Sequence, residues 1–416
     1  MPSAPRGVWR ELEALRVSPR ALADATAIVY LDLRDGHALH SAVLEAYQND
    51  KRIVLRPVSD DDMPAEVRAA RAGAGLVVSA SGNGSELRTT STDVPPDARP
   101  PGIGIFTSGT TGEPKLAWHT WASIAGPAAR AQTRLQAARW LMAYAPSSYA
   151  AMQVLFAATA GEGIVVYPDA LINVPHTIVG ARVDAISATP TWWRALAISW
   201  PEELSYPNLR QATLGGERAT QDVLDLVSRQ FRPQRMTHVY ASTEVGSALA
   251  VSDRREGFPA AWLQGGGEVQ LRIREGILEI RTPHRMLGYI GRDQAPTIEG
   301  WSITPDYAEL RGDRIVITGR ADGVLNIGGR KVSPEVLEER ILAADARVID
   351  CCVYAKPSPI TGFVLAADLV LVPGADPNHV RASLRTHISN EALPGVLRVV
   401  KALTQAPSGK KARTAP

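Results

Sequence analysis

Short apolar runs alternate with segments of helical spacing along residues 27–240 of the chain. Runs of this length predict buried strands, whereas apolar residues that recur every three or four positions predict helices. The expected strands are Ala27–Leu33, Arg52–Leu55, Gly75–Val78, Gly102–Phe106, Leu141–Tyr144, Ile164–Tyr167, Ala185–Ala188, Gln211–Leu214 and Met236–Tyr240. The expected helices are His40–Tyr47, Trp121–Ala138, Ala150–Ala160, a segment from Thr191, and Ala219–Arg229. Strands that alternate with helices are typical of βαβ units, so this region predicts a largely parallel sheet.

Three other stretches predict different local structure. Ser79–Gly102 is rich in turn formers and is expected to be a surface linker. Trp118–Trp121 is expected to begin a helix and to pack rather than to take part in chemistry. Further along, Glu268–Ile273 and Ile277–Arg281 flank Glu275–Gly276, which predicts antiparallel hairpins.

The C-terminal part of the chain predicts a separate α+β unit. Ser333 is the expected cap of a helix that has Pro334 at its first position and continues through Leu342. The other expected elements are strands Ile349–Tyr354, Val364–Val372 and Leu397–Val400 and a helix from Pro377 to about Ser389. The fold class is therefore α/β. A large N-terminal domain at residues 1–320 would hold the βαβ-type sheets and a β-hairpin-rich subdomain, and a small α+β domain would follow at 321–416.

Composition narrows the classes of protein that this pattern allows. The 416 residues suggest about two or three domains. Lys+Arg 45 against Asp+Glu 43 gives a formal charge of +2, too balanced for a protein that mainly binds nucleic acid. Cys351 and Cys352 can form neither a disulfide framework nor a metal quartet, which fits a reducing compartment, and we expect them to pack. Without an apolar stretch of about 20 residues or a secretory segment, we expect a cytoplasmic protein with no membrane partner.

The strongest local signal is the run Thr-Ser-Gly-Thr-Thr-Gly-Glu-Pro-Lys, which follows an expected strand. Glycines let backbone N–H groups turn toward an anion, hydroxyls add donors, and a lysine ammonium binds phosphate oxygens. No Gly-Lys-[Ser/Thr] closes the run, so it is not the P-loop of nucleotide hydrolases. The alternative is a solvated turn. The candidate phosphate-binding residues are Thr107, Ser108, Gly109, Thr110, Thr111, Gly112 and Lys115.

This run resembles the signature loop of the adenylate-forming superfamily, which includes acyl- and aryl-CoA ligases, luciferases and peptide-synthetase adenylation domains. Further stretches resemble that family's motifs in the family's order, and the resemblance spans residues 102–413. It implies ATP, Mg²⁺ and coenzyme A (or phosphopantetheine) as cofactors, and a C-terminal domain that moves. The matching stretches are Leu214–Glu217, Val239–Glu244, Gly300–Asp306, Gly319–Asp322, Leu325–Glu335 and Pro407–Arg413.

The resemblance also implies roles for single residues. Lys410 is the implied catalytic cation, accompanied by Thr243 and Glu244, and Glu244 and Thr110 are the implied Mg²⁺ ligands. Asp322 is the implied hinge. The plainer alternatives are an ordinary surface lysine at Lys410 and a helix-start glutamate at Glu244. The other implied nucleotide-binding and thiol-binding residues are Gly215, Gly216, Glu217, Tyr240, Ala241, Ser242, Asp306, Arg320, Gly328, Gly329 and Lys331.

Two residues depart from the family's motifs, and the region before the signature loop is shorter than in most members. Ala241 and Pro305 each stand where the family has glycine. Proline fixes φ and removes a donor, which puts the ribose-binding role of Asp306 in question. Beside the implied catalytic lysine, Lys411 is expected to be a solvated neighbour.

The segment Tyr144–Met152 bears on the acid substrate. In peptide-synthetase relatives an aspartate in the corresponding stretch receives the amino group of an amino acid, and this segment contains no acidic residue. A buried ammonium without a counter-charge is costly, which argues against an α-amino acid. Tyr149, Met152, Trp192 and Trp193 could form a flat apolar pocket, which favours an aryl or medium acyl acid, and His238 is a further candidate near the site. The alternative is that these aromatic side chains pack in the core.

Together these features predict a ligase that acts in two steps. ATP would activate a small carboxylic acid, aryl or of medium acyl length, to an acyl-AMP with release of pyrophosphate. The acyl group would then pass to a thiol, in the first instance coenzyme A. One alternative is an enzyme that loads an acyl carrier protein or an amine. Another, of a different class, is a nucleotide-binding remnant without turnover.

Overall fold

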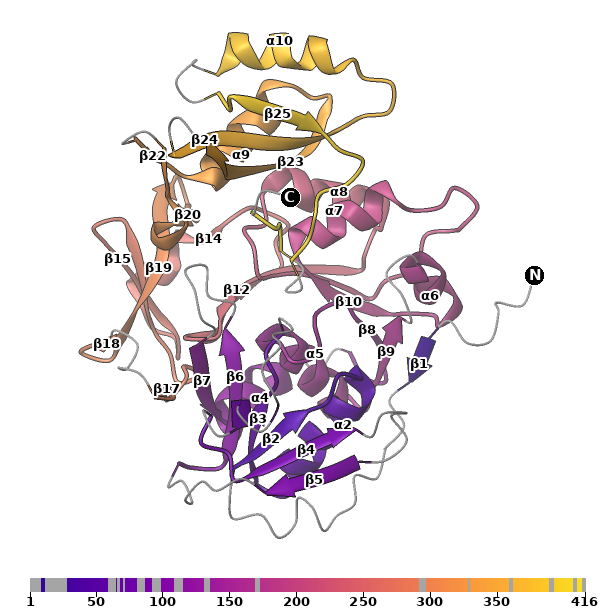
Figure 1. Cartoon of the computed structure of the whole chain (residues 1–416), viewed down its shortest axis with the longest axis vertical. Coiled ribbons are helices and arrows are strands. Elements are labelled where there is room, and N and C mark those ends of the chain that lie inside the picture. Colours follow the sequence, from indigo (N-terminus) through magenta and orange to yellow (C-terminus); the bar gives the residue numbers. More distant parts are fainter. Residues whose placement is uncertain are drawn as a thin grey trace.

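The structure is a computed structural model that describes residues 9–11, 28–58, 65, 68–69, 72–80, 87–91, 99–107, 115–130, 135–168, 173–291, 297–327, 330–358, 362–388, 393–406 and 410–413. Mixed α/β layers make up most of the molecule, with a smaller β-rich unit at the C-terminal end (Figure 1). Within the described ranges, no helix combines the length and the apolar character that a membrane span needs.

The first sheet is formed by N-terminal strands in the order β17-β7-β6-β3-β2-β4-β5. Strands β2, β3, β4 and β6 pair in parallel, whereas β5, β7 and β17 join antiparallel. Helix α2 begins at Asp35, whose carboxylate accepts the Ala38 N–H, as an N-cap should. The bounds are β2 Val29–Asp32, α2 Gly36–Gln48, β3 Arg52–Leu55, β4 Leu76–Ala80, β5 Leu87–Ser91, β6 Gly102–Thr107, β7 Lys115–Thr120 and β17 Gly288–Tyr289.

Two predictions for this sheet are wrong. The segment expected to be a surface linker contains β5, and Trp118–Trp121, expected to begin a helix, continues β7 as far as Thr120. Helix α4 (Trp121–Arg130) begins one residue later, and the described residues 135–138 are not helical. In both cases pairing with a neighbouring strand, β4 or β6, overrides the local pattern.

The second sheet has the order β1-β9-β8-β10-β11-β12-β13. Its five inner strands run in parallel, which confirms the prediction of βαβ units, while β1 and β13 join antiparallel. The strand bounds are β1 Trp9–Glu11, β8 Arg139–Met142, β9 Ile164–Pro168, β10 Ala185–Ala188, β11 Gln211–Leu214, β12 Arg235–Ser242 and β13 Gly246–Val251. The helices that connect them are α5 Tyr149–Ala160, α6 Val174–Gly180, α7 Pro190–Ile198 and α8 Gln221–Gln230.

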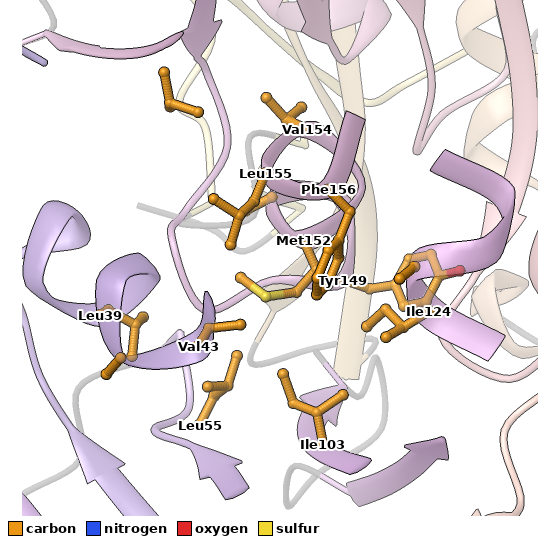
Figure 2. Packing of buried hydrophobic residues seen from close by; sticks show 14 of the residues in the cluster. Leu39, Val43, Leu55, Ile103, Ile124, Tyr149, Met152, Val154, Leu155 and Phe156 are labelled. Carbon is orange, nitrogen blue, oxygen red and sulfur yellow. The ribbon is translucent and has the colours of Figure 1, made fainter. Parts of the chain in front are cut away.

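The largest hydrophobic core lies between the two sheets and is filled by α2, α4 and α5. Helix α5 is buried on most sides, and its side chains contact residues of both sheets. In Figure 2 the side chain of Met152 on α5 extends toward Val43 of α2, with Leu55 of β3 and Ile103 of β6 beyond it. Fully burying one such side chain stabilises the fold by about 1.5–3 kcal/mol, so α5 fixes how the two sheets meet.

A third, antiparallel sheet confirms the predicted hairpins. Its order is β14-β20-β19-β16-β15, with β18 on β19. The β15–β16 turn lies at Glu275 and Gly276, whose φ angles of 53° and 77° suit a tight hairpin turn. The bounds are β14 Phe258–Pro259, η3 Ala260–Gln264, β15 Gln270–Arg274, β16 Ile277–Arg281, β18 Thr297–Ile298, β19 Trp301–Arg311 and β20 Arg314–Arg320.

The C-terminal unit consists of the sheet β23-β24-β25 with α9 and α10, drawn in orange and yellow in Figure 1. Ser333 caps α9 as predicted, because its hydroxyl accepts the Val336 N–H. Cys351 and Cys352 are buried in β23, which confirms their packing role. The bounds are η4 Ala321–Gly323, β21 Leu325–Ile327, β22 Arg330–Val332, α9 Pro334–Ala344, β23 Val348–Ser358, β24 Gly362–Leu371, α10 Pro377–His387 and β25 Val396–Val399.

Candidate active site

The expected phosphate loop lies between β6 and β7. Thr107 pairs with Lys115 at the point where the two strands enter and leave the loop. The Lys115 ammonium lies 5.4 Å from the ring centroid of Tyr289, a cation–π distance. Ser108, Gly109, Thr110, Thr111 and Gly112 lie outside the described residues, so their roles stay predictions.

A buried polar cluster lies where β12 meets β19 and β20. The Tyr240 hydroxyl donates to a carboxylate oxygen of Asp306, and the other carboxylate oxygen is 3.7 Å from the Arg320 guanidinium. Burial foremost, and then the Asp306 charge, hold the pKa of Tyr240 well above its ordinary value, so the phenol stays a donor. The three residues that were predicted to bind the nucleoside therefore lie together.

Pro305 does not displace Asp306 from this cluster. It lies inside β19, where Asp306 remains paired with Arg320 on β20. The Asp306 N–H donates to the Thr304 hydroxyl at 3.2 Å. Proline at position 305 is therefore compatible with the pairing of Asp306 in β19 and with its contacts to Tyr240 and Arg320.

The β12–β13 turn carries Thr243 and Glu244. The His119 Nε2–H donates to the Thr243 carbonyl at 2.7 Å, and burial lowers the pKa of His119 to about 4, so its ring is neutral. The Tyr289 hydroxyl donates to the Glu244 carboxylate at 2.7 Å. Among the described residues no group of three or more His, Cys, Asp or Glu side chains could hold a metal ion by itself. One carboxylate nevertheless fits Mg²⁺, which binds proteins through one or two carboxylates plus substrate phosphates.

Two further predicted residues shape the same turn. The Ser242 hydroxyl accepts the Val245 N–H at 3.3 Å, which closes the turn after β12. Ala241 packs against the main hydrophobic core, so its methyl group is accommodated where the family has glycine. The structure thus explains the local shape of the turn, and the nucleotide-binding roles of both residues stay predictions.

The loop after β11 faces the C-terminal end of the chain. Gly216 has φ +81°, and a Cβ atom there would lie 3.8 Å from Lys410 Cε. One Glu217 carboxylate oxygen accepts the Thr191 N–H at the start of α7 (3.0 Å), and the other accepts the Lys411 N–H (3.1 Å). Glu217 therefore connects the second sheet to the C-terminal tail, which we define as residues 400–406 and 410–413.

Lys410 lies among charged groups from four different segments. Burial foremost lowers its pKa below the ordinary value, and the Arg320 charge acts in the same direction. The carboxylates of Glu217, Asp306 and Glu244 favour the charged form and act against this shift. The structure therefore brings together Lys410 and the residues predicted for the adenine, ribose and metal sites.

The tail folds back on itself to hold Lys410 at this place. The Lys410 carbonyl accepts the Ala406 N–H at 2.7 Å, and the Ala412 N–H donates to the Thr404 carbonyl at 2.9 Å. Lys411 is not the solvated neighbour that we expected, because its side chain is only 13% exposed and pairs with Glu338 and Asp350. Figure 1 shows the tail in yellow, running from β25 toward the middle of the molecule.

The candidate pocket residues lie in three different surroundings. Tyr149 and Met152 belong to the main core, with 7% and 0% exposure, and Trp192 packs in the core around α7 and α8. The His238 Nε2–H donates to the Gly257 carbonyl at 2.8 Å. Tyr149 contacts the segment after the Glu244 turn, since its hydroxyl accepts the Ser247 N–H. The pocket assignments stay predictions.

The predicted hinge and mobile loop are covered only in part. Asp322 lies in η4, between β20 and β21, and its side chain is outside the described part. Gly328 and Gly329 also lie outside the described residues, and only the backbone of Lys331, in β22, is described. No role of these residues is tested by the structure.

Sequence reasoning missed two residues that hold the site together. His119 and Tyr289 support Thr243 and Glu244, across 124 and 45 positions of sequence. Neither residue belongs to a recognisable motif. His119 lies in β7, the strand that follows the phosphate loop, and Tyr289 lies in β17, which pairs with β7.

Comparison with known proteins agrees with this geometry. A model of the AMP-binding enzyme family matches residues 20–289, and one of the AMP-binding enzyme C-terminal domain matches residues 337–410. A 2-succinylbenzoate–CoA ligase of Listeria innocua is 24% identical over 323 residues, which cover 74% of this chain and 67% of that protein. A probable 2-succinylbenzoate–CoA ligase of Mycobacterium tuberculosis is 28% identical over 331 residues, which cover 75% of this chain and 82% of that protein.

Solved structures show the same fold. The o-succinylbenzoate CoA synthetase of Bacillus subtilis, in complex with its acyl-adenylate intermediate, superposes with a TM-score of 0.68 at 20% identity. The match covers 93% of this chain and 87% of that one.

Proposed function

Because this chain belongs to the AMP-binding enzyme family and is an AMP-forming acid–thiol ligase, we propose that it activates an aryl or medium acyl carboxylic acid and transfers the acyl group to coenzyme A. The observation that carries this proposal is the position of Lys410. Its partly buried ammonium lies within electrostatic reach of Glu217, Asp306 and Glu244, from three segments of the large sheets. A cation in such a place suits a reaction that develops negative charge around a phosphorus atom.

In the first step a substrate carboxylate oxygen attacks the α-phosphorus of ATP. The new bond joins that oxygen to phosphorus, the bond from the α-phosphorus to the bridging oxygen breaks, and pyrophosphate leaves with the electron pair. Lys410 stabilises the charge that builds up, with Thr243 and Glu244 beside it. Thr107, Lys115 and the loop between them hold the phosphates, and the Tyr240–Asp306–Arg320 cluster, together with Gly215, Gly216, Glu217, Ala241 and Ser242, orients the nucleoside.

Mg²⁺, held by Glu244 and Thr110, would neutralise phosphate charge. Tyr289 keeps the Glu244 carboxylate in a fixed orientation through the 2.7 Å hydrogen bond. One carboxylate oxygen of Glu244 takes part in this bond, so the other can face the phosphates. The neutral His119 ring donates to the Thr243 carbonyl and so stabilises the β12–β13 turn.

In the second step the thiol sulfur attacks the acyl carbon, the bond from that carbon to the AMP oxygen breaks, and the thiol proton passes to solvent. We place the division between the two domains after residue 320, with a mobile domain at 321–416. Rotation about Asp322 would withdraw Lys410 and bring Gly328, Gly329 and Lys331 to the thiol. Domain motions of this kind commonly complete an active site for the next step.

The proposed acid class rests on one segment of the sequence and on the names of the relatives. The segment from Tyr144 to Met152 has no acidic side chain to pair with a substrate ammonium, and Tyr149 lies beside the Glu244 turn. The relatives whose names specify 2-succinylbenzoate act on an aromatic acid, which supports an aryl substrate here. Trp192, Met152 and His238 remain candidates for the rest of the pocket.

The experiment measures pyrophosphate release with ATP and a panel of aryl, alkyl and amino acids. Aryl acids should lead, and a clear preference for an α-amino acid would refute the pocket assignment. Lys410→Ala should lose ATP–pyrophosphate exchange by at least about a hundredfold and keep thioester formation from a supplied acyl-adenylate. Lys401→Ala, an exposed lysine in the same tail, is the matched control. Comparing thioester yield with coenzyme A and with a pantetheine-loaded carrier protein decides between those acceptors.

A further inference from the structure

The ammonium group of Lys411 is fully engaged inside the C-terminal unit. It donates to the Asp350 carboxylate at 2.9 Å, to the Cys351 carbonyl at 2.6 Å and to the Glu338 carboxylate at 3.3 Å. An ammonium has three N–H donors, so each has an acceptor. The side chains of Glu338 and Asp350 are only 8% and 5% exposed. The three acceptors and the low exposure of the two carboxylates together form a binding site for the Lys411 side chain.

Arg413 strengthens the same attachment from two positions further along the tail. Its guanidinium pairs with Glu338 and Glu335 of α9 and donates to the Val353 carbonyl at 3.0 Å. Burial alone would lower the pKa of Lys411, but the carboxylates of Glu338 and Asp350 outweigh it and hold that pKa above its ordinary value. The cluster is therefore charged and locks the tail to α9 and β23.

The backbone of the same residue contacts the other side of the interface. The Lys411 N–H donates to Glu217 at 3.1 Å, in the loop that Lys410 faces. Lys410 and Lys411 are neighbours in a segment that pairs antiparallel with Gln405. A Cβ atom at Gly216 would lie 3.8 Å from Lys410 Cε, whereas the Lys411 ammonium donates to Glu338 and Asp350. Lys410 therefore points to the candidate active site while Lys411 points into the C-terminal unit.

We propose that Lys411 is a positioning residue, whose side chain anchors the tail to the C-terminal unit so that Lys410 reaches the nucleotide site; this rests on the catalytic role of Lys410 in the proposed function. Lys411 touches no substrate in this role. It sets the place from which Lys410 acts and ties the movement of Lys410 to that of the C-terminal unit.

The first test is Lys411→Met in the full chain, which keeps the length of the side chain and removes its donors. ATP–pyrophosphate exchange, with an acid that the wild type activates, should fall at least tenfold. Thioester formation from supplied acyl-adenylate should stay within twofold. Hydrogen exchange of the Ala406 and Ala412 amides should rise at least tenfold, because the tail is no longer held. Lys401→Met, an exposed lysine of the tail, is the matched control.

A second variant separates positioning from stability, since Lys411→Met leaves Asp350 without its cation. Lys411→Met combined with Asp350→Asn removes that unpaired charge and should melt close to the wild type. It should still show the loss of pyrophosphate exchange. The positioning role is refuted if the double variant regains full pyrophosphate exchange. It is also refuted if the single variant keeps full pyrophosphate exchange and slow hydrogen exchange of the tail amides.

The hydrogen-exchange readout also tells the two proposals apart. Faster hydrogen exchange of the tail with unchanged pyrophosphate exchange would show that the anchor does not position Lys410 and would refute the positioning role, whereas the catalytic role of Lys410 is decided separately by Lys410→Ala. If the wild type activates no acid of the panel, the proposed function fails, and amide protection at Ala406 and Ala412 still decides whether Lys411 holds the tail.

Discussion

Arg218 and Glu339 form a bidentate ion pair, with N–O distances of 2.9 and 3.2 Å, that joins the loop after β11 to helix α9. Arg218 directly follows Glu217, which accepts the Lys411 N–H. Two neighbouring residues of one loop thus bind the C-terminal unit in the arrangement that brings Lys410 to the candidate site. A contact that forms in one arrangement of the two domains and not in another shifts the conformational equilibrium toward the first.

We therefore expect Glu339→Gln to slow adenylation. The pair is partly exposed, so its loss should cost about 1 kcal/mol, or about fivefold in the rate of ATP–pyrophosphate exchange. Arg218 remains paired with Glu256 in this variant, so no buried charge is left alone. Thioester formation from supplied acyl-adenylate should be unchanged or faster. Glu203→Gln, on an exposed glutamate, is the control, and equal loss in both half-reactions would contradict a role in the arrangement of the units.

The depressed pKa of Lys410 predicts the alkaline limit of adenylation. The charged form is the active one, so the rate should fall as pH rises through this pKa, and the fall should begin below the ordinary lysine value of 10.5. Lys410→Arg, whose guanidinium stays protonated above about pH 12, should lower the rate and abolish that fall. The measurement is pyrophosphate exchange as a function of pH. Parallel profiles for the two proteins would show that another group titrates.

Tyr289→Phe tests the support of Glu244. The variant keeps the aromatic ring that faces Lys115 and removes only the hydroxyl that donates to the Glu244 carboxylate. A hydrogen bond to a charged group is worth about 1.5–3 kcal/mol, so the Mg²⁺ concentration for half-maximal adenylation should rise about tenfold. Tyr307→Phe, whose side chain is exposed, serves as the control. An unchanged Mg²⁺ dependence would argue against Glu244 as the metal ligand.

From the buried His40 ring we predict how the free energy of unfolding depends on pH. Its Nε2–H donates to the Pro146 carbonyl at 2.8 Å, and its Nδ1 accepts from the Tyr167 hydroxyl. Burial lowers the pKa of His40 from 6.5 to about 4, and the charge of His37 acts in the same direction, while the hydrogen bond to Pro146 and the charge of Asp35 oppose the shift.

The sign follows from proton binding. The unfolded chain binds a proton at His40 near pH 6.5 and the folded chain does not, so this stability is present above pH 6.5 and is lost as pH falls toward 4. The loss is about 1.4 kcal/mol per pH unit in that window. His40→Gln, which keeps a donor for Pro146, should unfold in denaturant with a shallower pH dependence. Equal slopes for the two proteins would rule out His40 as the source.

The local sequence pattern was sufficient to predict a helix or strand where the residues of that element determine its structure. Gln211–Leu214 was predicted with the bounds that the structure has, because it is a short run within a stretch where expected strands and helices alternate. The start of α9 was likewise predicted, since Ser333 and Pro334 form a cap that acts within one turn.

The local sequence pattern gave wrong predictions where residues distant in the sequence determine the structure. The segment Leu87–Ser91 has one apolar residue and is a strand only because β4 lies beside it. Trp118–Thr120 fits either a helix or a strand by spacing, and pairing with β6 selects the strand. Lys411 was expected in solvent because its acceptors lie 61 and 73 positions away, too far for any local pattern to indicate.

The hairpin-like fold of the tail makes its length between Thr404 and Arg413 critical. Both edges of this segment are tied, through the Ala406–Lys410 and Ala412–Thr404 backbone bonds. A shift of this segment by one residue would bring one lysine into the place of the other, Lys411 at the candidate active site or Lys410 at the carboxylate cluster. Because both residues are lysines, either place would still receive an ammonium from such a shift toward it, so the register of the tail, and not the residue type alone, determines which lysine meets the nucleotide.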